Sequence, residues 1–261
     1  MPHAPIPHAV LLFFAAVVAG VINSVAGGGG FITFPALVFA GIPPVAANAT
    51  STVALWPGTV ASSGAYRREL QHKTQWLAML PLLVVSLFGA VAGALLLLRT
   101  PPHLFMRIVP WLLLGATLLF IFGARISQFI RARMHQHQRA DALHLAGITI
   151  LQLATSVYIG YFGAGAGMIM LALFALMGME NIHNMNAYKT VLASVANGVA
   201  VVTFIFAGAV AWPQAVVMIV GAAIGGYGGA YFAQKLDPIA VRRVVIAIGL
   251  AMTAYFFLHP Q

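Results

Sequence analysis

Gly27-Gly28-Gly29-Gly30 interrupts a hydrophobic run at a point where an uninterrupted helix is expected. Residues 9–26 before it and residues 31–40 after it are almost entirely apolar. Each glycine lowers helix propensity by about 1 kcal/mol relative to alanine, so four in succession favour a local unwinding of the backbone. Unwound N–H and C=O groups cannot face lipid, so protein has to bury the break or a wet cavity has to meet it.

A second interruption of the same kind lies in the other half of the chain. It reads Gly163-Ala164-Gly165-Ala166-Gly167 and again separates two apolar stretches. It follows an apolar run and lacks the lysine of a phosphate-binding P-loop, so we discard a nucleotide site. We expect the two breaks to lie face to face and to form a binding site between them.

The composition indicates an integral membrane protein. Of the 261 residues, 61% are hydrophobic and 7% are charged, whereas about a quarter of the residues of a soluble domain are charged. The absence of cysteine excludes disulfides, thiolate metal sites and thiol catalysis. The net charge of +9 lies in short gaps between apolar runs. We therefore expect it to set topology and to contact lipid headgroups, with no nucleic acid as a partner.

The apolar stretches predict an all-α polytopic membrane protein. In the first half, unbroken stretches cover residues 45–66, 76–98 and 103–122. At 1.5 Å per residue, each is long enough for a hydrocarbon core of about 30 Å. Residues 31–40 cover only about 15 Å. The glycine-rich segment therefore either crosses together with residues 9–26 as a broken helix or re-enters, and both alternatives stay open.

The pattern restarts after residue 141, which indicates a duplication. The glycine break and three further landmarks recur at offsets of 136 to 138 residues. The three landmarks are Asn48-Ala49 with Asn186-Ala187, Gly89 and Gly93 with Gly225 and Gly229, and Pro102 and Arg107 with Pro238 and Arg243. The GxxxG pairs also predict close helix contacts. We predict two repeats of about four helical segments each, 1–123 and 142–261, joined by a basic cytoplasmic linker at 124–141 within one integrated transmembrane domain.

Charge favours an inverted arrangement of the repeats. If the broken segments re-enter, the gaps 67–73, 123–141 and 235–243 share one side and hold ten of the thirteen Lys and Arg residues. Lys189 lies inside a span, and Arg99 and Arg107 lie on the opposite side. A parallel arrangement divides the twelve charges other than Lys189 seven against five. The positive-inside rule then predicts that the basic side is cytoplasmic and that both termini lie outside.

This architecture predicts a site for an anion. Inverted repeats with broken helices at mid-depth are typical of secondary transporters. Short helices starting at Phe31 and Met168 would aim N-termini, each worth about half a positive charge, at the membrane centre. Lys189 would add a full positive charge. Inserting a lysine at the centre of a membrane helix costs about 2.5–3.5 kcal/mol of free energy. The candidate substrate-binding residues are Asn23, Gly28, Gly29, Gly30, Asn48, Thr50, Ser51, Gly165, Gly167, Asn186, Lys189 and Thr190.

Each of these signals has an alternative that the sequence leaves open. The glycines also fit close helix packing. Lys189, four residues into a segment that starts near Met185, also fits a side chain that snorkels to the basic side. Hydrogen bonds between helices would equally explain the asparagines, which are Asn23, Asn48, Asn186 and Asn197.

Chemistry other than transport has little support in the sequence. The acidic residues all lie in polar gaps, and neither HExxH nor GxSxG occurs. A buried acid for catalysis or an intramembrane proton relay is therefore not expected. The four acidic residues are Glu69, Asp141, Glu180 and Asp237. We interpret His135, His137 and His144 as part of a solvated loop. No enzyme activity, metal or cofactor is predicted.

A family resemblance agrees with these inferences. The first half contains Asn23-Ser24, the run from Ala26 to Phe31, Pro35, Pro43-Pro44, and Ala47 with Thr50-Ser51. The second half repeats this pattern more loosely around its own break. The pattern resembles the TauE/SafE sulfite exporter family of bacterial permeases. The resemblance implies export of sulfite, or of small sulfur-containing organic anions such as sulfoacetate, across the cytoplasmic membrane.

Together these inferences predict a multi-pass secondary transporter of the bacterial inner membrane with both termini in the periplasm. It would move sulfite or a small organosulfonate outward, with a small anion and membrane lipids as its partners. An uptake permease for sulfate or thiosulfate is the alternative within the same class. A membrane enzyme or an assembly subunit is the alternative from another class. The coupling ion and a homo-oligomeric state are left open.

Overall fold

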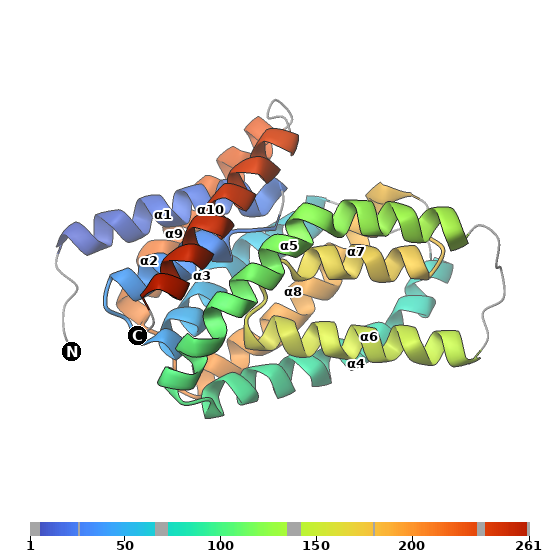
Figure 1. Ribbon diagram of the computed structural model, residues 1–261, viewed down its shortest axis with the longest axis horizontal. Coiled ribbons are helices and arrows are strands. Elements are labelled where there is room, and N and C mark those ends of the chain that lie inside the picture. Colours follow the sequence, from blue (N-terminus) through green and yellow to red (C-terminus); the bar gives the residue numbers. More distant parts are fainter. Residues whose placement is uncertain are drawn as a thin grey trace.

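The computed structural model describes residues 6–25, 27–65, 73–134, 142–179, 181–233 and 238–259. This part of the chain forms ten α-helices and contains no strand, so the all-α prediction is confirmed (Figure 1). The first half contains α1 (Ile6–Val25), α2 (Gly30–Phe39), α3 (Pro44–Ala65), α4 (Lys73–Arg99) and α5 (Pro102–Met134). The second half contains α6 (Ala142–Tyr161), α7 (Ala166–Leu176), α8 (Ile182–Phe206), α9 (Trp212–Ala233) and α10 (Pro238–Leu258).

Both predicted breaks are present. The first separates α1 from α2, and the second separates α6 from α7. Gly27 and Gly163 take φ angles of 75° and 79°. These angles lie in the left-handed region, which glycine enters without steric cost. The second short helix begins at Ala166 rather than at Met168, because Gly165, also left-handed, ends the unwound segment two residues earlier than expected.

One predicted gap is shorter than expected. Residues 124–134 of the predicted linker continue α5 as far as Met134, while residues 135–141 lie outside the described part of the chain. This stretch contains no glycine or proline and alternates arginines with apolar residues. Such a pattern keeps helix propensity high while it lowers the mean hydropathy. Its buried Ser127 hydroxyl donates to the carbonyl oxygen of Leu171 on α7 at 3.4 Å.

Within the described residues, four stretches are long and apolar enough to cross a membrane on their own. They lie in α4, α5, α8 and α10, as Met79–Arg99, Pro102–Gly123, Asn184–Phe206 and Ala240–Leu258. The sequence had predicted that residues 45–66 would also be a full-length span. The corresponding helix α3 does not belong to the four, because Asn48 and several Ser and Thr residues lower its hydropathy. Of these polar residues, Asn48, Thr50 and Ser51 are buried in the interior of the protein.

The predicted GxxxG contacts occur at the α4–α6 interface. A Cβ on Gly89 would lie 2.9 Å from the carbonyl oxygen of Leu153, and one on Gly93 would overlap the carbonyl of Val157. In the α1–α9 interface, a Cβ on Gly225 would likewise overlap the Val17 carbonyl. The backbones therefore approach as closely as only glycine allows.

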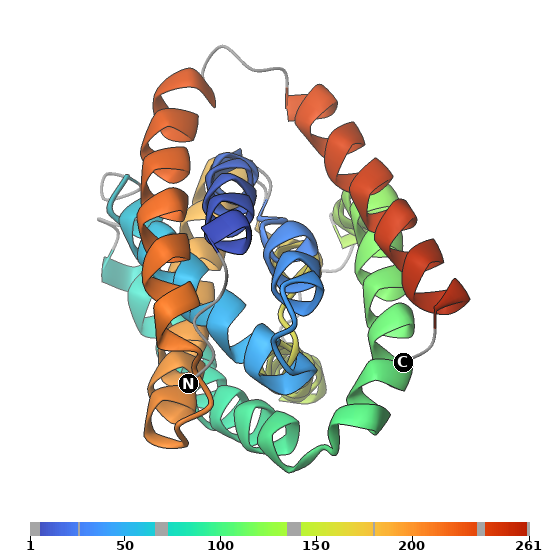
Figure 2. The ribbon, with the colours of Figure 1, turned by 90° about the vertical axis from the view of Figure 1, so that its left-hand side faces the viewer.

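The neighbours of the helices correspond when the two halves are exchanged. Helix α1 packs along α9, and α6 packs along α4. In the same way α3 contacts α9, α8 contacts α4, and α3 and α8 contact each other. Figure 2 shows α9 and α10 on the two sides of α1 and α2. Two related halves would produce this pattern; the internal duplication and its inverted orientation remain predictions.

An arginine side chain of α10 forms hydrogen bonds to α5. The Arg242 guanidinium donates to the carbonyl oxygens of Phe120 at 2.7 Å and Ile121 at 3.1 Å. Phe120 is fully buried, and its ring meets Phe31 of α2 edge to face with centroids 5.7 Å apart. The α5–α10 pair therefore supports the beginning of α2, directly after the first break.

Candidate functional site

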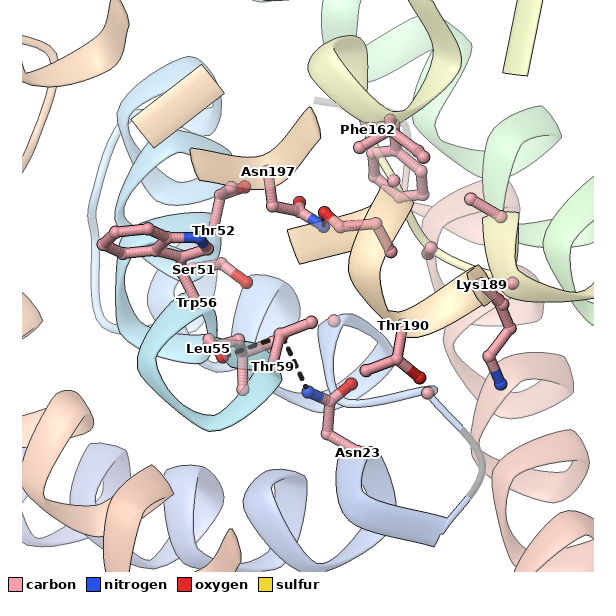
Figure 3. Close-up of a pocket in the computed structure, with 18 of the residues that line it drawn as sticks. Asn23, Ser51, Thr52, Leu55, Trp56, Thr59, Phe162, Lys189, Thr190 and Asn197 are labelled. Carbon is pink, nitrogen blue, oxygen red and sulfur yellow. Dashed lines mark hydrogen bonds between the residues drawn. The ribbon is translucent and has the colours of Figure 1, made fainter. Parts of the chain in front are cut away.

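A cavity of about 200 Å³ lies between the two breaks (Figure 3). Its walls are one face each of α3 and α8, and the two breaks border it. It is lined by Asn23, Gly27, Gly30, Ser51, Thr52, Leu55, Trp56, Thr59, Ile159, Phe162, Gly163, Ala164, Ala166, Gly167, Asn186, Lys189, Thr190, Ala193 and Asn197.

Helices α3 and α8 contribute matching positions to this cavity. On each helix the lining residues follow the i, i+3, i+4 spacing that keeps side chains on one face. Positions 138 residues apart line the cavity in pairs, which are Ser51 with Lys189, Thr52 with Thr190, Leu55 with Ala193 and Thr59 with Asn197. The pairs differ in chemistry, most strongly where Ser51 of one half is a lysine in the other.

The two breaks face each other, as predicted. A Cβ on Gly30, the first residue of α2, would lie 3.9 Å from the Cβ of Ala164 in the second break. The N–H groups of Gly30 and Gly167, both in the cavity lining, have no acceptor within the described residues. Unpaired N–H groups are expected in the first turn of a helix. Both short helices therefore present N-terminal N–H groups at this cavity.

Carbonyl groups at the breaks are satisfied by side chains. The Thr33 hydroxyl donates to the carbonyl oxygen of Gly29 at 3.2 Å and lies 2.6 Å from the Ser51 hydroxyl. In the second break, the Tyr158 hydroxyl donates to the carbonyl oxygen of Ala164 at 2.5 Å. These two carbonyl oxygens therefore have their partners within the protein.

Lys189 brings a full positive charge to the same place. It lies in the second turn of α8, and its Nζ donates to Oδ1 of Asn186 at 2.8 Å. Its stem passes the N-terminus of α7, since a Cβ on Gly167 would lie 3.3 Å from Lys189 Cδ. An ammonium group and a helix N-terminus both favour anions. The described residues include no carboxylate, because all four acidic residues lie outside them.

Comparison with known proteins agrees with this architecture. Residues 12–256 match the family model described as Sulfite exporter TauE/SafE. The chain belongs to this family. Probable membrane transporter protein ORF9 of Sinorhizobium sp is 30% identical over 251 residues, which cover 95% of this chain and 92% of that protein. A probable membrane transporter protein of Haemophilus influenzae is 29% identical over 247 residues, 94% of this chain and 92% of that protein.

A third relative, probable membrane transporter protein YfcA of Escherichia coli K12, is 28% identical over 245 residues, covering 94% of this chain and 87% of that protein. No solved structure matches the chain. The protein is therefore a membrane transporter of the TauE/SafE family, and the resemblance in the sequence motifs is confirmed.

Seven of the predicted substrate-binding residues of this TauE/SafE member line the cavity: Asn23, Gly30, Ser51, Gly167, Asn186, Lys189 and Thr190. They come from α1, α2, α3, α7 and α8. The structure therefore brings together residues that are up to 167 positions apart in the sequence. Their role in binding remains a prediction.

The other three glycines of the prediction lie outside the lining and serve packing. Gly28 and Gly29 are both buried. A Cβ on Gly28 would lie 2.8 Å from Val245 Cγ1, and a Cβ on Gly29 would lie 2.9 Å from the Ala19 carbonyl oxygen. Gly165 is the N-cap of α7 and takes a left-handed conformation. A Cβ on Gly165 would lie 3.1 Å from Ala116, which belongs to α5. For these three, the alternative of close packing describes the structure better.

Asn48 and Thr50 also lie outside the cavity lining. The Asn48 amide donates to the carbonyl oxygen of Tyr161 at 3.0 Å, which ties α3 to the end of α6. The Thr50 hydroxyl accepts from the backbone N–H of Ala211, just before α9, at 3.0 Å. Both residues are buried and connect segments of the fold. Interhelical hydrogen bonding therefore explains Asn48, as one of the alternatives proposed.

Several lining residues were not predicted from the sequence, including Thr52, Thr59 and Asn197. Helical spacing from Ser51 leads to Thr59 two turns later, and the 138-residue offset leads from Thr190 to Thr52 and from Thr59 to Asn197. Trp56 lies one turn after Thr52, and Phe162 lies directly before the second break. Their residue type gives no signal for a polar site, because an aromatic side chain in an apolar segment normally faces lipid or core. No group of three or more His, Asp or Glu side chains that would suit a metal occurs in the described part of the chain.

Proposed function

We propose that this transporter moves a small anion, either sulfite or a small sulfur-containing organic anion, outward across the cytoplasmic membrane. The observation that carries the proposal is the position of Lys189, whose stem passes the N-terminus of α7 at the cavity. Two positive elements in one site repel each other, and a bound anion would relieve that repulsion. The description of the matching family, Sulfite exporter, supports sulfite and the outward direction as the first choice.

The cavity also offers the hydrogen bonds that an oxyanion needs. An ammonium group has three donors, of which Lys189 gives one to Asn186. The N–H groups of Gly30 and Gly167 add further donors at the same cavity, whereas the hydroxyl hydrogen of Thr190 goes to the carbonyl oxygen of Asn186. Hydrogen bonds from charged donors are the strong ones, so Lys189 is expected to dominate affinity.

A binding screen on the purified protein tests the proposal. The ligands are sulfite, sulfate, thiosulfate and sulfoacetate, with choline as a cationic control. A ligand at a concentration of about 100 Kd stabilises the folded state by about 2.7 kcal/mol. We expect a rise in melting temperature with sulfite or sulfoacetate and none with choline. A preference for sulfate or thiosulfate would favour the uptake permease, and no response to any anion at millimolar concentration would refute the proposal.

The inverted topology is tested by reporter fusions. We propose that the ten basic residues of the gaps 67–73, 123–141 and 235–243 face the cytoplasm. A reporter fused after Gln261 should then report the periplasm, and one inserted within residues 135–141, beyond the end of α5, should report the cytoplasm. Two reporters on the same side would exclude an inverted arrangement.

A further inference from the structure

A second, apolar cleft lies next to the anion cavity and shares Trp56 with it. Its volume is about 650 Å³, and residues of α3, α4 and α8 line it. Val60, Val91 and Val202 in its lining are 44%, 37% and 49% exposed, so the cleft is open at the outer surface of the helices. The lining consists of Trp56, Val60, Ser63, Val91, Val191, Ser194, Val195, Gly198, Val199, Val202 and Thr203.

The hydroxyl groups of this cleft are already paired. The hydroxyl oxygens of Ser63 and Ser194 lie 2.7 Å apart, and the Thr203 hydroxyl donates to the carbonyl oxygen of Val199 at 2.8 Å. Since these polar groups are satisfied, the cleft provides space for apolar groups and no charged partner for an anion. It differs in this respect from the cavity at Lys189.

Trp56 is the one described residue that lines both the cavity and the cleft. Its indole Nε1 donates to the carbonyl oxygen of Ser194 at 2.9 Å, which fixes the ring to α8. One turn further along α8, Gly198 makes room for the ring, because a Cβ there would lie 3.1 Å from both Cζ2 and Nε1. Figure 3 shows the indole at the edge of the cavity on the side of α3.

The indole and the proposed anion site lie on opposite sides of the same cavity. Trp56 is on the side of α3, and Lys189 is across from it (Figure 3). Next to Trp56 the cavity lining is partly apolar, with Leu55 and Ala193. A carbon chain attached to an anion held at Lys189 would therefore extend across the cavity towards the indole.

We propose that Trp56 limits the length of the carbon chain of the substrates that the transporter accepts; this inference rests on the proposed anion transport. The indole closes the anion cavity against the apolar cleft, so the substrate class is an anionic head with a short apolar chain. Removing the indole joins the two spaces and allows a longer chain to extend into the cleft. Trp56 is thus a specificity-determining residue whose ring is held by Ser194 and Gly198.

The test measures binding of a series of linear alkanesulfonates, from methanesulfonate to hexanesulfonate, to purified wild type, Trp56→Ala and Val60→Ala. Val60→Ala is the matched control, because Val60 is on the same helix and lines the cleft but not the cavity. In the wild type, affinity should fall once the chain reaches the indole. In Trp56→Ala, hexanesulfonate should gain about tenfold in affinity relative to methanesulfonate, since several additional methylenes become buried. Val60→Ala should keep the wild-type order, because the indole still separates the two spaces.

Two further variants support the test if Trp56→Ala does not fold. Trp56→Phe leaves a smaller ring without the Nε1 hydrogen bond and should shift the chain-length preference in the same direction by a smaller factor. Gly198→Ala should push the indole towards the cavity and weaken the longest ligand that the wild type binds. An unchanged chain-length order in Trp56→Phe and Trp56→Ala, with methanesulfonate still bound, would overturn the inference and leave anion binding intact. Absence of binding by every sulfonate in the wild type would instead overturn the proposed function.

Discussion

Lys189→Met weakens the binding of sulfite or sulfoacetate by about tenfold or more, or about 1.4 kcal/mol. The variant keeps the length and the apolar stem of the side chain but removes the one cationic group that lines the cavity within the described residues. In a site of low dielectric constant, attraction between an ammonium group and an anion is much stronger than in water. Isothermal titration or thermal stabilisation by the anion measures the loss.

Two controls separate this effect from a general change in charge. Lys189→Arg keeps the charge and should do less harm. Arg243→Met removes the same charge from an exposed position on α10, next to the Arg242 that holds α5. Surface charges are screened within about 8 Å at physiological ionic strength, so Arg243→Met should leave affinity within about twofold. If Lys189→Met also stays within about twofold, Lys189 serves as a snorkelling residue and the anion site lies elsewhere.

Gly30→Val abolishes anion binding while the protein still folds, whereas Gly29→Val impairs folding. The added side chain at Gly30 projects between the two breaks, where the nearest atom to its Cβ is the Ala164 Cβ at 3.9 Å. At Gly29 a Cβ would lie 2.9 Å from the Ala19 carbonyl oxygen and 3.1 Å from Leu55, so backbone has to move. Overpacking of this kind costs about 1–3 kcal/mol or more.

The two glycine variants are compared by expression, melting temperature and anion affinity. Gly30→Val should have a melting temperature near that of the wild type and no anion-induced stabilisation. Gly29→Val should yield little folded protein. Normal anion affinity in Gly30→Val would show that the N-terminus of α2 takes no part in binding, and the site would then have to be sought on α7 and α8 alone.

Most of the helices were predictable from local properties of the sequence. Hydropathy located the apolar stretches, and the loss of helix propensity at the glycines placed both breaks. The exception is the end of α5, where average hydropathy fell while helix propensity stayed high up to Met134. Averaging over a window cannot separate those two properties.

The candidate site was predictable in its general position but not residue by residue. The glycine breaks, Lys189 and Asn186 could be named because each is unusual within an apolar segment. Whether Gly29 or Gly30 faces the cavity depends on how α1 and α3 pack against the first break, and adjacent residues on a helix point about 100° apart. Trp56 and Phe162 could not be singled out at all, because an aromatic residue has the same hydropathy in a lipid-facing position and in a cavity wall.

The amino-acid sequence by itself thus determined a polytopic all-α protein with two glycine breaks, since these features follow from local propensity and hydropathy. It also singled out Lys189, because a lysine is unusual within an apolar segment. Only the tertiary structure decided that Gly28, Gly29 and Gly165 pack against neighbouring helices and that Asn48 and Thr50 connect segments of the fold. It also decided that Trp56 stands between a polar cavity and an apolar cleft. The physical reason is that these roles depend on contacts between segments far apart in the chain, and no local preference of a residue encodes them.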